Sequence, residues 1–161
     1  MLEEGNNFFR RNLLEEASET YREALDRLKK WNENVYGDQV YTWKHLHLSL
    51  LLNVSRSERK RGHYEESVDF ATEAIEMDPE STETLITRAK AFKVGNMISE
   101  ALEDYTTALR IDPTNKAIYL DFLKLREKLK LTLRSRKNAF FSQSCDSIAY
   151  IDDSVTNCSS I

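Results

Sequence analysis

The sequence holds few of the residues on which secreted, membrane-spanning and metal-binding proteins depend. Its 161 residues include four Gly, two Pro and two Cys. The cysteines, Cys145 and Cys158, both lie in a polar C-terminal stretch and lack metal-ligand spacing. No apolar run approaches the ~18 residues that a membrane-spanning helix needs. The first residues also lack the basic and apolar regions of a secretory signal. We therefore expect a cytoplasmic protein without a disulfide framework.

Residue patterns that carry catalysis or bind cofactors are also missing. His45 and His47 are two residues apart, so on a helix they point to different sides and cannot share a metal ion. The scattered glycines form no phosphate-binding loop, and neither cysteine has a suitable histidine partner. A net charge of −4 gives no overall reason to expect nucleic acid. We expect no enzyme, no cofactor, no metal and no nucleic-acid partner.

What the sequence does contain is an internal repeat with a period of 34 residues, counted from Gly62 to Asn96. The segment Gly62–Ser67 recurs as Asn96–Ala101, and the Asp-Pro pair at Asp78 recurs at Asp112. A period of this length is typical of stacked helical hairpins. A charged fraction of 31% with few Gly and Pro also favours helices. The predicted fold class is all-α, with three helical hairpins.

The repeats predict a layout for the chain. A domain over residues 1–136 contains hairpins at about 1–47, 48–81 and 82–115, a capping helix at 116–136, and then a flexible tail at 137–161. Small side chains at Ala89, Ala101 and Ala108 should let the helices approach closely. The chain opens in the middle of a helix of the first hairpin, which suggests a piece of a larger protein.

Two places depart from the template. The first hairpin has a surplus between Lys30 and His47 that contains Trp31, Tyr36, Tyr41 and Trp43. We expect longer helices there, meeting at a turn near Gly37, with these aromatic side chains packed between them. Glu58 stands where an aromatic residue or Leu is usual. We expect that end of its helix to be more solvated than normal.

The pattern resembles tetratricopeptide repeats over most of residues 1–136, because small, aromatic and Pro positions fall in phase. The resemblance implies a right-handed superhelix whose first helices line a concave peptide-binding groove. Glu3–Asn6, Leu50–Arg56 and the Arg59-Lys60 pair also resemble the repeat segment of the TANC and rolling-pebbles scaffold family. Those are large cytoplasmic proteins beneath the plasma membrane, at synapses or sites of myoblast fusion. This second resemblance implies a non-catalytic docking module within such a scaffold.

The tetratricopeptide resemblance also implies which residues face the groove. They are Asn6, Phe9, Arg10, Asn53, Arg56, Arg59, Lys60, Glu83, Thr87, Lys90 and Lys93. Six are cationic and one is anionic, which is opposite to the sign of the net charge. A groove with low-dielectric walls would focus this field on an extended acidic peptide, or on the C-terminal segment of a partner's cytoplasmic tail. The alternative interpretation is that these cations lie on ordinary solvated helix faces.

Many domains of this kind hold the terminal carboxylate of a chaperone with a two-carboxylate clamp. The clamp positions here are Leu2, Asn6, Asn53, Glu83 and Thr87, so its three cations are missing. Each lost charged hydrogen bond is worth roughly 1.5–3 kcal/mol. We expect no strong binding to Hsp70- or Hsp90-type tails. A co-chaperone role and self-association remain alternatives.

Two C-terminal motifs predict further contacts. The stretch 124–141 combines seven cations with apolar residues, which suits an anionic membrane surface or calmodulin, or simply the soluble basic end of a capping helix. The sequence Ser159-Ser160-Ile161 fits a PDZ ligand if Ile161 is the native C-terminus, and means nothing otherwise.

Overall fold

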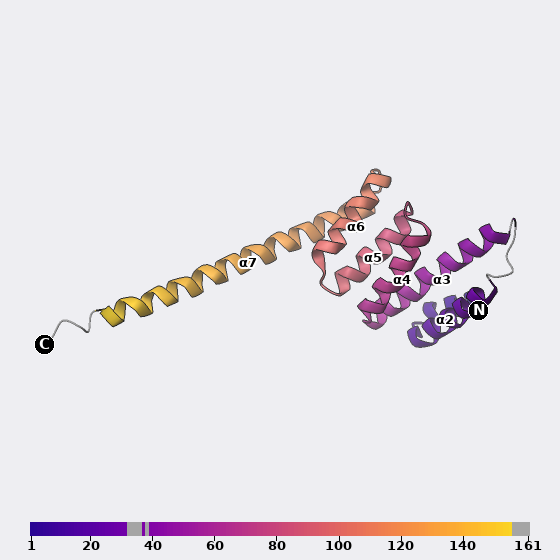
Figure 1. Ribbon diagram of the computed structural model, residues 1–161, viewed down its shortest axis with the longest axis horizontal. Coiled ribbons are helices and arrows are strands. Elements are labelled where there is room, and N and C mark those ends of the chain that lie inside the picture. Colours follow the sequence, from indigo (N-terminus) through magenta and orange to yellow (C-terminus); the bar gives the residue numbers. More distant parts are fainter. Residues whose placement is uncertain (32–36, 38, 156–161) are drawn as a thin grey trace. The chain divides into compact units, whose positions relative to one another are not determined.

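Helices make up the described part of the chain, which comprises residues 1–31, 37 and 39–155 of a computed structural model, with side chains to residue 137 (Figure 1). Each of the first three pairs of consecutive helices packs together as a hairpin, and neighbouring hairpins contact each other. This confirms the predicted all-α hairpin fold. The helices are α1 (Leu2–Arg10), α2 (Leu14–Trp31), α3 (Gln39–Arg61), α4 (Tyr64–Met77), α5 (Thr82–Val94), α6 (Ile98–Ile111) and α7 (Lys116–Val155).

The tight turn inside each hairpin depends on one residue with left-handed backbone geometry. Asn12, Gly62 and Asn96 have φ angles of 62°, 90° and 59°. Gly and Asn adopt this conformation more readily than other residues, which explains why these residue types recur at the turn. The turns place α1, α3 and α5 as the first helices of successive hairpins.

The hairpins pack closely because small residues stand where helices meet. Ala89, Ala101 and Ala108 are fully buried, as the sequence predicts. In α1 the corresponding small residue is Gly5, where an added Cβ atom would lie 2.4 Å from the ring of Tyr21. Tyr21 itself is 1% exposed, so its ring has no free space to move into. The sequence therefore fixes the spacing of α1 and α2 through one small residue and one large one.

The surplus in the first hairpin extends α2 and α3, as expected. Trp43 joins the two extensions, since its indole Nε1 donates a hydrogen bond to the carbonyl of Leu28 at 3.1 Å. The prediction of a common aromatic packing layer is wrong for Tyr41, which is 78% exposed, and for Trp31, which is 44% exposed. Tyr41 and Trp43 are two residues apart on one helix, so only one of them can point toward α2. Tyr36 lies outside the described residues.

The helix boundaries differ from the predicted ones in two places. The expected division between the first two hairpins, at residues 47 and 48, falls inside α3. The repeat period reports only the part of a helix that recurs, and the extension of α3 has no counterpart in the next hairpin. The helix predicted to end near residue 136 continues to Val155, because its Ser- and Asp-containing end is still compatible with helix.

The structure divides into two compact units, residues 1–122 and residues 123–161. The first unit contains the three hairpins and the start of α7, where Ile118 is buried. The second contains the rest of α7. The capping role of residues 116–136 and the flexibility of residues 137–161 stay predictions.

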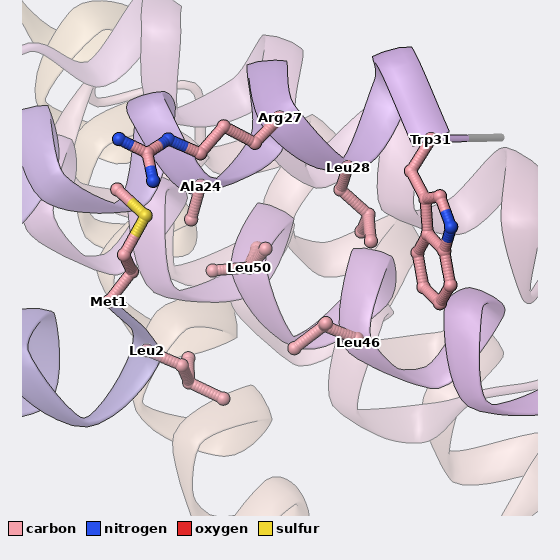
Figure 2. A pocket seen from close by; sticks show the side chains of 8 residues that line it. All are labelled: Met1, Leu2, Ala24, Arg27, Leu28, Trp31, Leu46 and Leu50. Carbon is pink, nitrogen blue, oxygen red and sulfur yellow. The ribbon is translucent and has the colours of Figure 1, made fainter.

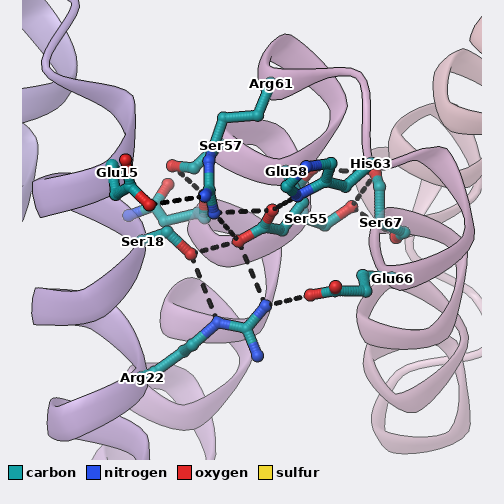
Figure 3. Close-up of polar contacts among 11 residues, drawn as sticks. Glu15, Ser18, Arg22, Ser55, Ser57, Glu58, Arg61, His63, Glu66 and Ser67 are labelled. Atoms are coloured by element: carbon teal, nitrogen blue, oxygen red, sulfur yellow. Dashed lines mark hydrogen bonds and ion pairs between the residues drawn. The ribbon is translucent and has the colours of Figure 1, made fainter.

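The sequence-based expectation that Glu58 is solvated is wrong: the side chain is buried, and Figure 3 shows its polar contacts. Its carboxylate accepts hydrogen bonds from Ser18, from Arg22 at 3.0 Å and from Arg61 at 3.0 Å, and contacts Nδ1 of His63 at 2.9 Å. Burial alone would raise the pKa of Glu58, but the hydrogen bonds and the charge of Arg61 outweigh it and lower this pKa. The network joins α2, α3 and the start of α4 at a position that the repeat pattern reserves for an apolar residue.

Candidate functional site

A chain of hydrogen bonds connects the first helices of all three hairpins. Asn6 of α1 accepts hydrogen bonds on Oδ1 from the hydroxyl of Tyr21 at 2.7 Å and from Nδ2 of Asn53 on α3 at 3.3 Å. Arg56 then donates from Nη1 to Oδ1 of Asn53 at 3.4 Å and from Nη2 to Glu83 of α5 at 2.5 Å. Four of the residues predicted to face one groove, Asn6, Asn53, Arg56 and Glu83, therefore lie next to one another. We call this surface the inner-helix face.

A cavity of about 270 Å³ opens on this face between α3 and α5. Arg56 and Arg59 line it from α3, and Glu83, Thr87 and Lys90 line it from α5, so five of the residues predicted to face the groove share one cavity. Three cations and one anion, Glu83, contribute to its lining. The complete lining is Arg56, Arg59, Thr82, Glu83, Ile86, Thr87 and Lys90.

Two polar groups near the cavity are buried without a partner in the described part of the chain: Nε of Arg59 and the hydroxyl of Tyr105. Burial lowers the pKa of Arg59, and the adjacent charge of Arg56 lowers it further, with Tyr105 acting in the opposite direction. Burial also raises the pKa of Tyr105 to about 12, with a further contribution from Asp121. The cavity thus concentrates positive charge in a partly desolvated place, where it acts more strongly on an anion than it would in water.

The other predicted residues occupy different positions. Lys60 places Nζ over the ring of Phe9, 4.2 Å from the ring centre, so this cation and this aromatic residue do come together. Arg10 is exposed and donates from Nε to the backbone carbonyl of Asn6 at 3.1 Å. Lys93 is exposed in the last turn of α5 and does not line the cavity. Their roles in binding stay predictions.

A second cavity, of about 360 Å³, lies between α1, α2 and α3, and sequence reasoning missed it (Figure 2). Its lining is mostly apolar: Met1, Leu2, Ala24, Arg27, Leu28, Trp31, Leu46 and Leu50. The sequence signal that could have revealed this cavity is the four-residue spacing of Leu46 and Leu50, which puts both side chains on one face of a helix. Nothing in its chemistry favours a charged ligand.

Neither a membrane span nor a metal site emerges from the described residues. No helix there combines the length and apolar character needed to cross a bilayer. No group of three or more His, Cys, Asp or Glu side chains is arranged there to hold a metal ion. The cations of residues 124–137 are exposed on α7, while the side chains of 138–141 and the motif Ser159–Ile161 lie outside the described residues. The predicted membrane and PDZ contacts are therefore still predictions.

Known proteins place this geometry in context, although no protein-family model matches the chain. Protein unc-45 homolog B of Danio rerio is 27% identical over 135 residues, covering 81% of this chain and 13% of that protein, so the chain spans only a small part of this relative. The C-terminal TPR-containing domain of a Plasmodium falciparum FK506-binding protein superposes with a TM-score of 0.69 at 27% identity, covering 82% of this chain and 87% of that one. UNC-45 of Caenorhabditis elegans, solved in complex with an Hsp90 peptide, superposes with a TM-score of 0.63 at 26% identity. The match covers 80% of this chain and 13% of the UNC-45 chain.

The chain has the tetratricopeptide-repeat (TPR) fold. Its inner-helix face is formed by the first helices of three TPR hairpins, α1, α3 and α5. The closer resemblance to the TANC and rolling-pebbles family stays a prediction.

The residues at the TPR clamp positions do not form a cationic clamp in the structure. Leu2 lines the apolar cavity, and Glu83 is paired with Arg56. Thr87 is 4% exposed, and its hydroxyl donates to the carbonyl of Glu83 at 2.8 Å. Asn6 and Asn53 lie together, as a clamp requires, but the cations on this TPR domain stand at other positions, among them Arg59 and Lys90. The face is cationic without the usual clamp.

Proposed function

We propose that this TPR domain is a non-catalytic binding module that takes an extended acidic peptide along its inner-helix face. One observation carries the proposal: Arg56, Arg59 and Lys90 line one cavity beside the Asn6–Asn53 pair, with Glu83 as the single anion in the lining. The amides would contact the peptide backbone, and the cations would hold acidic side chains or a terminal carboxylate. Helices that are already packed would lose little entropy on binding.

The contribution of each cation follows from its exposure. Arg56 is about one-third exposed, with a side-chain value of 34%, and Lys90 is exposed. A hydrogen bond to a charged group is worth roughly 1.5–3 kcal/mol when well shielded. Exposure reduces this to about 1 kcal/mol for each residue, or roughly a fivefold change in Kd.

The direct test is a titration of the chain with a labelled peptide of alternating Glu and Ser, blocked at both ends. Arg56→Gln and Lys90→Gln should each weaken binding by roughly fivefold, and by more in combination. Lys44→Gln is the matched control, since Lys44 is an exposed cation on α3 that does not line the cavity. Equal losses in all three variants would reduce the effect to net charge and count against the proposal.

A co-chaperone function is the second candidate, and it is favoured by the structural similarity to UNC-45, which was solved with an Hsp90 peptide. Asn6 and Asn53 stand at clamp positions, while Leu2, Glu83 and Thr87 replace the clamp cations. We expect weak binding of a labelled Glu-Glu-Val-Asp peptide with a free C-terminus. A low-micromolar Kd would instead support the co-chaperone function.

The setting that we propose is a cytoplasmic scaffold at the plasma-membrane cortex, supported only by the resemblance of Glu3–Asn6 and Leu50–Arg56 to the TANC and rolling-pebbles family. Affinity capture with the wild-type chain and with an Asn53→Ala, Arg56→Glu variant would identify partners that depend on the inner-helix face. Light scattering over a range of concentrations tests the self-association alternative. A mass that rises with concentration would favour it.

A further inference from the structure

The cavity already holds one carboxylate, supplied by the chain itself. Glu83 of α5 pairs through Oε1 with Nη2 of Arg56 on α3, at 2.5 Å. The Glu83 side chain is 62% exposed and that of Arg56 is 34% exposed, so water reaches the pair. An ion pair in such a place is weak and easily exchanged. Glu83 is therefore paired with Arg56, but another anion can displace it.

The two terminal nitrogens of Arg56 are both engaged in the free chain. Nη1 donates to Oδ1 of Asn53 at 3.4 Å and Nη2 donates to Glu83. A guanidinium carries five N–H groups, so an anion can bind Arg56 beside these acceptors, but a carboxylate that binds both terminal nitrogens at once competes with them for the same edge. Glu83 is the easier one to replace, because it lies on an exposed side chain whereas Asn53 is held by Asn6.

The remaining cations of the cavity have no anion of their own among the described residues. Arg59 has a buried Nε without a hydrogen-bond partner, and neither Arg59 nor Lys90 forms an ion pair there. A guanidinium N–H that is buried without an acceptor is unusual in proteins. The three cations of the cavity therefore exceed the one negative charge that Glu83 supplies.

We propose that this cavity is a carboxylate-binding subsite in which Glu83 is an internal competitor that the ligand displaces from Arg56. The inference rests on the proposed acidic-peptide function and adds a mechanism to it. In the bound state the ligand carboxylate accepts hydrogen bonds from Arg56, while Arg59 and Lys90 stabilise its charge. Glu83 then returns to solvent, so binding discriminates against ligands too weakly anionic to replace it.

The test uses the full chain and fluorescence anisotropy with the blocked Glu-Ser peptide. Glu83→Gln should tighten binding by about 2- to 5-fold, the value of one solvent-exposed ion pair. Glu80→Gln makes the same change in net charge at an exposed acid just before α5, outside the cavity lining, and should alter Kd much less. An equal gain in both variants would overturn the proposal.

A double-mutant cycle separates competition at Arg56 from a general charge effect. In the Arg56→Gln background, Glu83→Gln should no longer tighten binding, because the guanidinium for which Glu83 competes is already absent. A gain that persists in that background contradicts the mechanism. Binding by the wild type that depends on Arg56 and Lys90 but ignores Glu83→Gln would overturn this inference and leave the proposed function intact. Absence of binding by every variant would overturn both.

The source of the carboxylate is distinguished by a second probe pair, Glu-Glu-Val-Asp with a free or an amidated C-terminus. A ligand that uses acidic side chains binds equally in both forms, and one that uses a terminal carboxylate loses affinity on amidation. A spectroscopic readout on the wild-type chain guards against misfolded variants. The Nε–H signal of Arg59 should shift on saturation with the bound peptide, and an unchanged signal would exclude it from the subsite.

Discussion

Replacing Glu58 by Gln should destabilise the fold strongly, although repeat patterns would class the position as a surface irregularity. The carboxylate is fully buried and interacts with Ser18, Arg22, Arg61 and His63. Removing one partner of a buried ion pair typically costs 3–5 kcal/mol. The cost here should be smaller, about 2–3 kcal/mol, because Arg22 and Arg61 are partly exposed and keep other carboxylate partners.

Urea unfolding followed by circular dichroism measures this free energy directly. The matched control is Glu23→Gln, which removes the same charge from an exposed pair with Arg27, where the side chains are 58% and 67% exposed. The control should change the free energy of unfolding by no more than about 0.5 kcal/mol. If Glu58→Gln lowered the free energy of unfolding no more than Glu23→Gln does, the Glu58 network would not be stabilising the hairpins.

The same variant has a pH signature. The pKa of Glu58 is lowered in the folded chain relative to its ordinary value of 4.5. Its contribution is therefore present above about pH 4.5 and is lost as the pH falls toward the lower folded-state value. The Glu58→Gln variant should lose less stability than the wild type between pH 5 and about pH 3. Parallel curves for the two proteins would contradict the lowered pKa.

Three further predictions concern buried positions. Burial lowers the pKa of His47, so the unfolded chain takes up a proton below about pH 6.5 that the folded chain does not, and the free energy of unfolding should fall there. Thermal unfolding of the His47→Phe variant should lack this pH-dependent loss. Gly5→Ala should cost about 1–3 kcal/mol in urea unfolding, because the new Cβ atom would overlap the ring of Tyr21, and an unchanged midpoint would show that the ring can move. Tyr105→Phe should leave stability unchanged or raise it by up to about 1 kcal/mol, since its buried hydroxyl has no partner in the described residues; a clear loss would reveal one.

The sequence predicts the fold well because its signal is repeated. The return of Gly62–Ser67 at Asn96–Ala101 predicts hairpins of fixed length, and the structure has left-handed turns at the start of each of these segments. The alanines predicted at helix contacts stand where small residues recur at equivalent positions of the repeat, and Ala89, Ala101 and Ala108 are buried. A period constrains every hairpin at once, so a single atypical residue does not disturb the prediction.

Features that occur only once were harder to predict. Glu58 looks like a solvated exception when it is considered alone, because its partner Arg22 comes from another hairpin and cannot be identified by spacing. Tyr41 and Trp43 are both aromatic, but the phase of an unrepeated helix extension decides which of them packs against α2. The cavity that contains Arg59 depends on how α3 and α5 pack, and the pairing of Arg56 with Glu83 depends on side-chain geometry. Sequence patterns predict which face of a helix a residue occupies, but the side chains with which it pairs are known only from the structure.

The most direct test of the central claim is the Kd of the blocked Glu-Ser peptide for the wild-type chain and for the Arg56→Gln, Lys90→Gln double variant, measured beside Lys44→Gln. We expect the double variant to lose at least tenfold in affinity, while the affinity of Lys44→Gln stays within about twofold of the wild type. Equal affinities for all three proteins would show that the cationic cavity on the inner-helix face is not where acidic peptides bind.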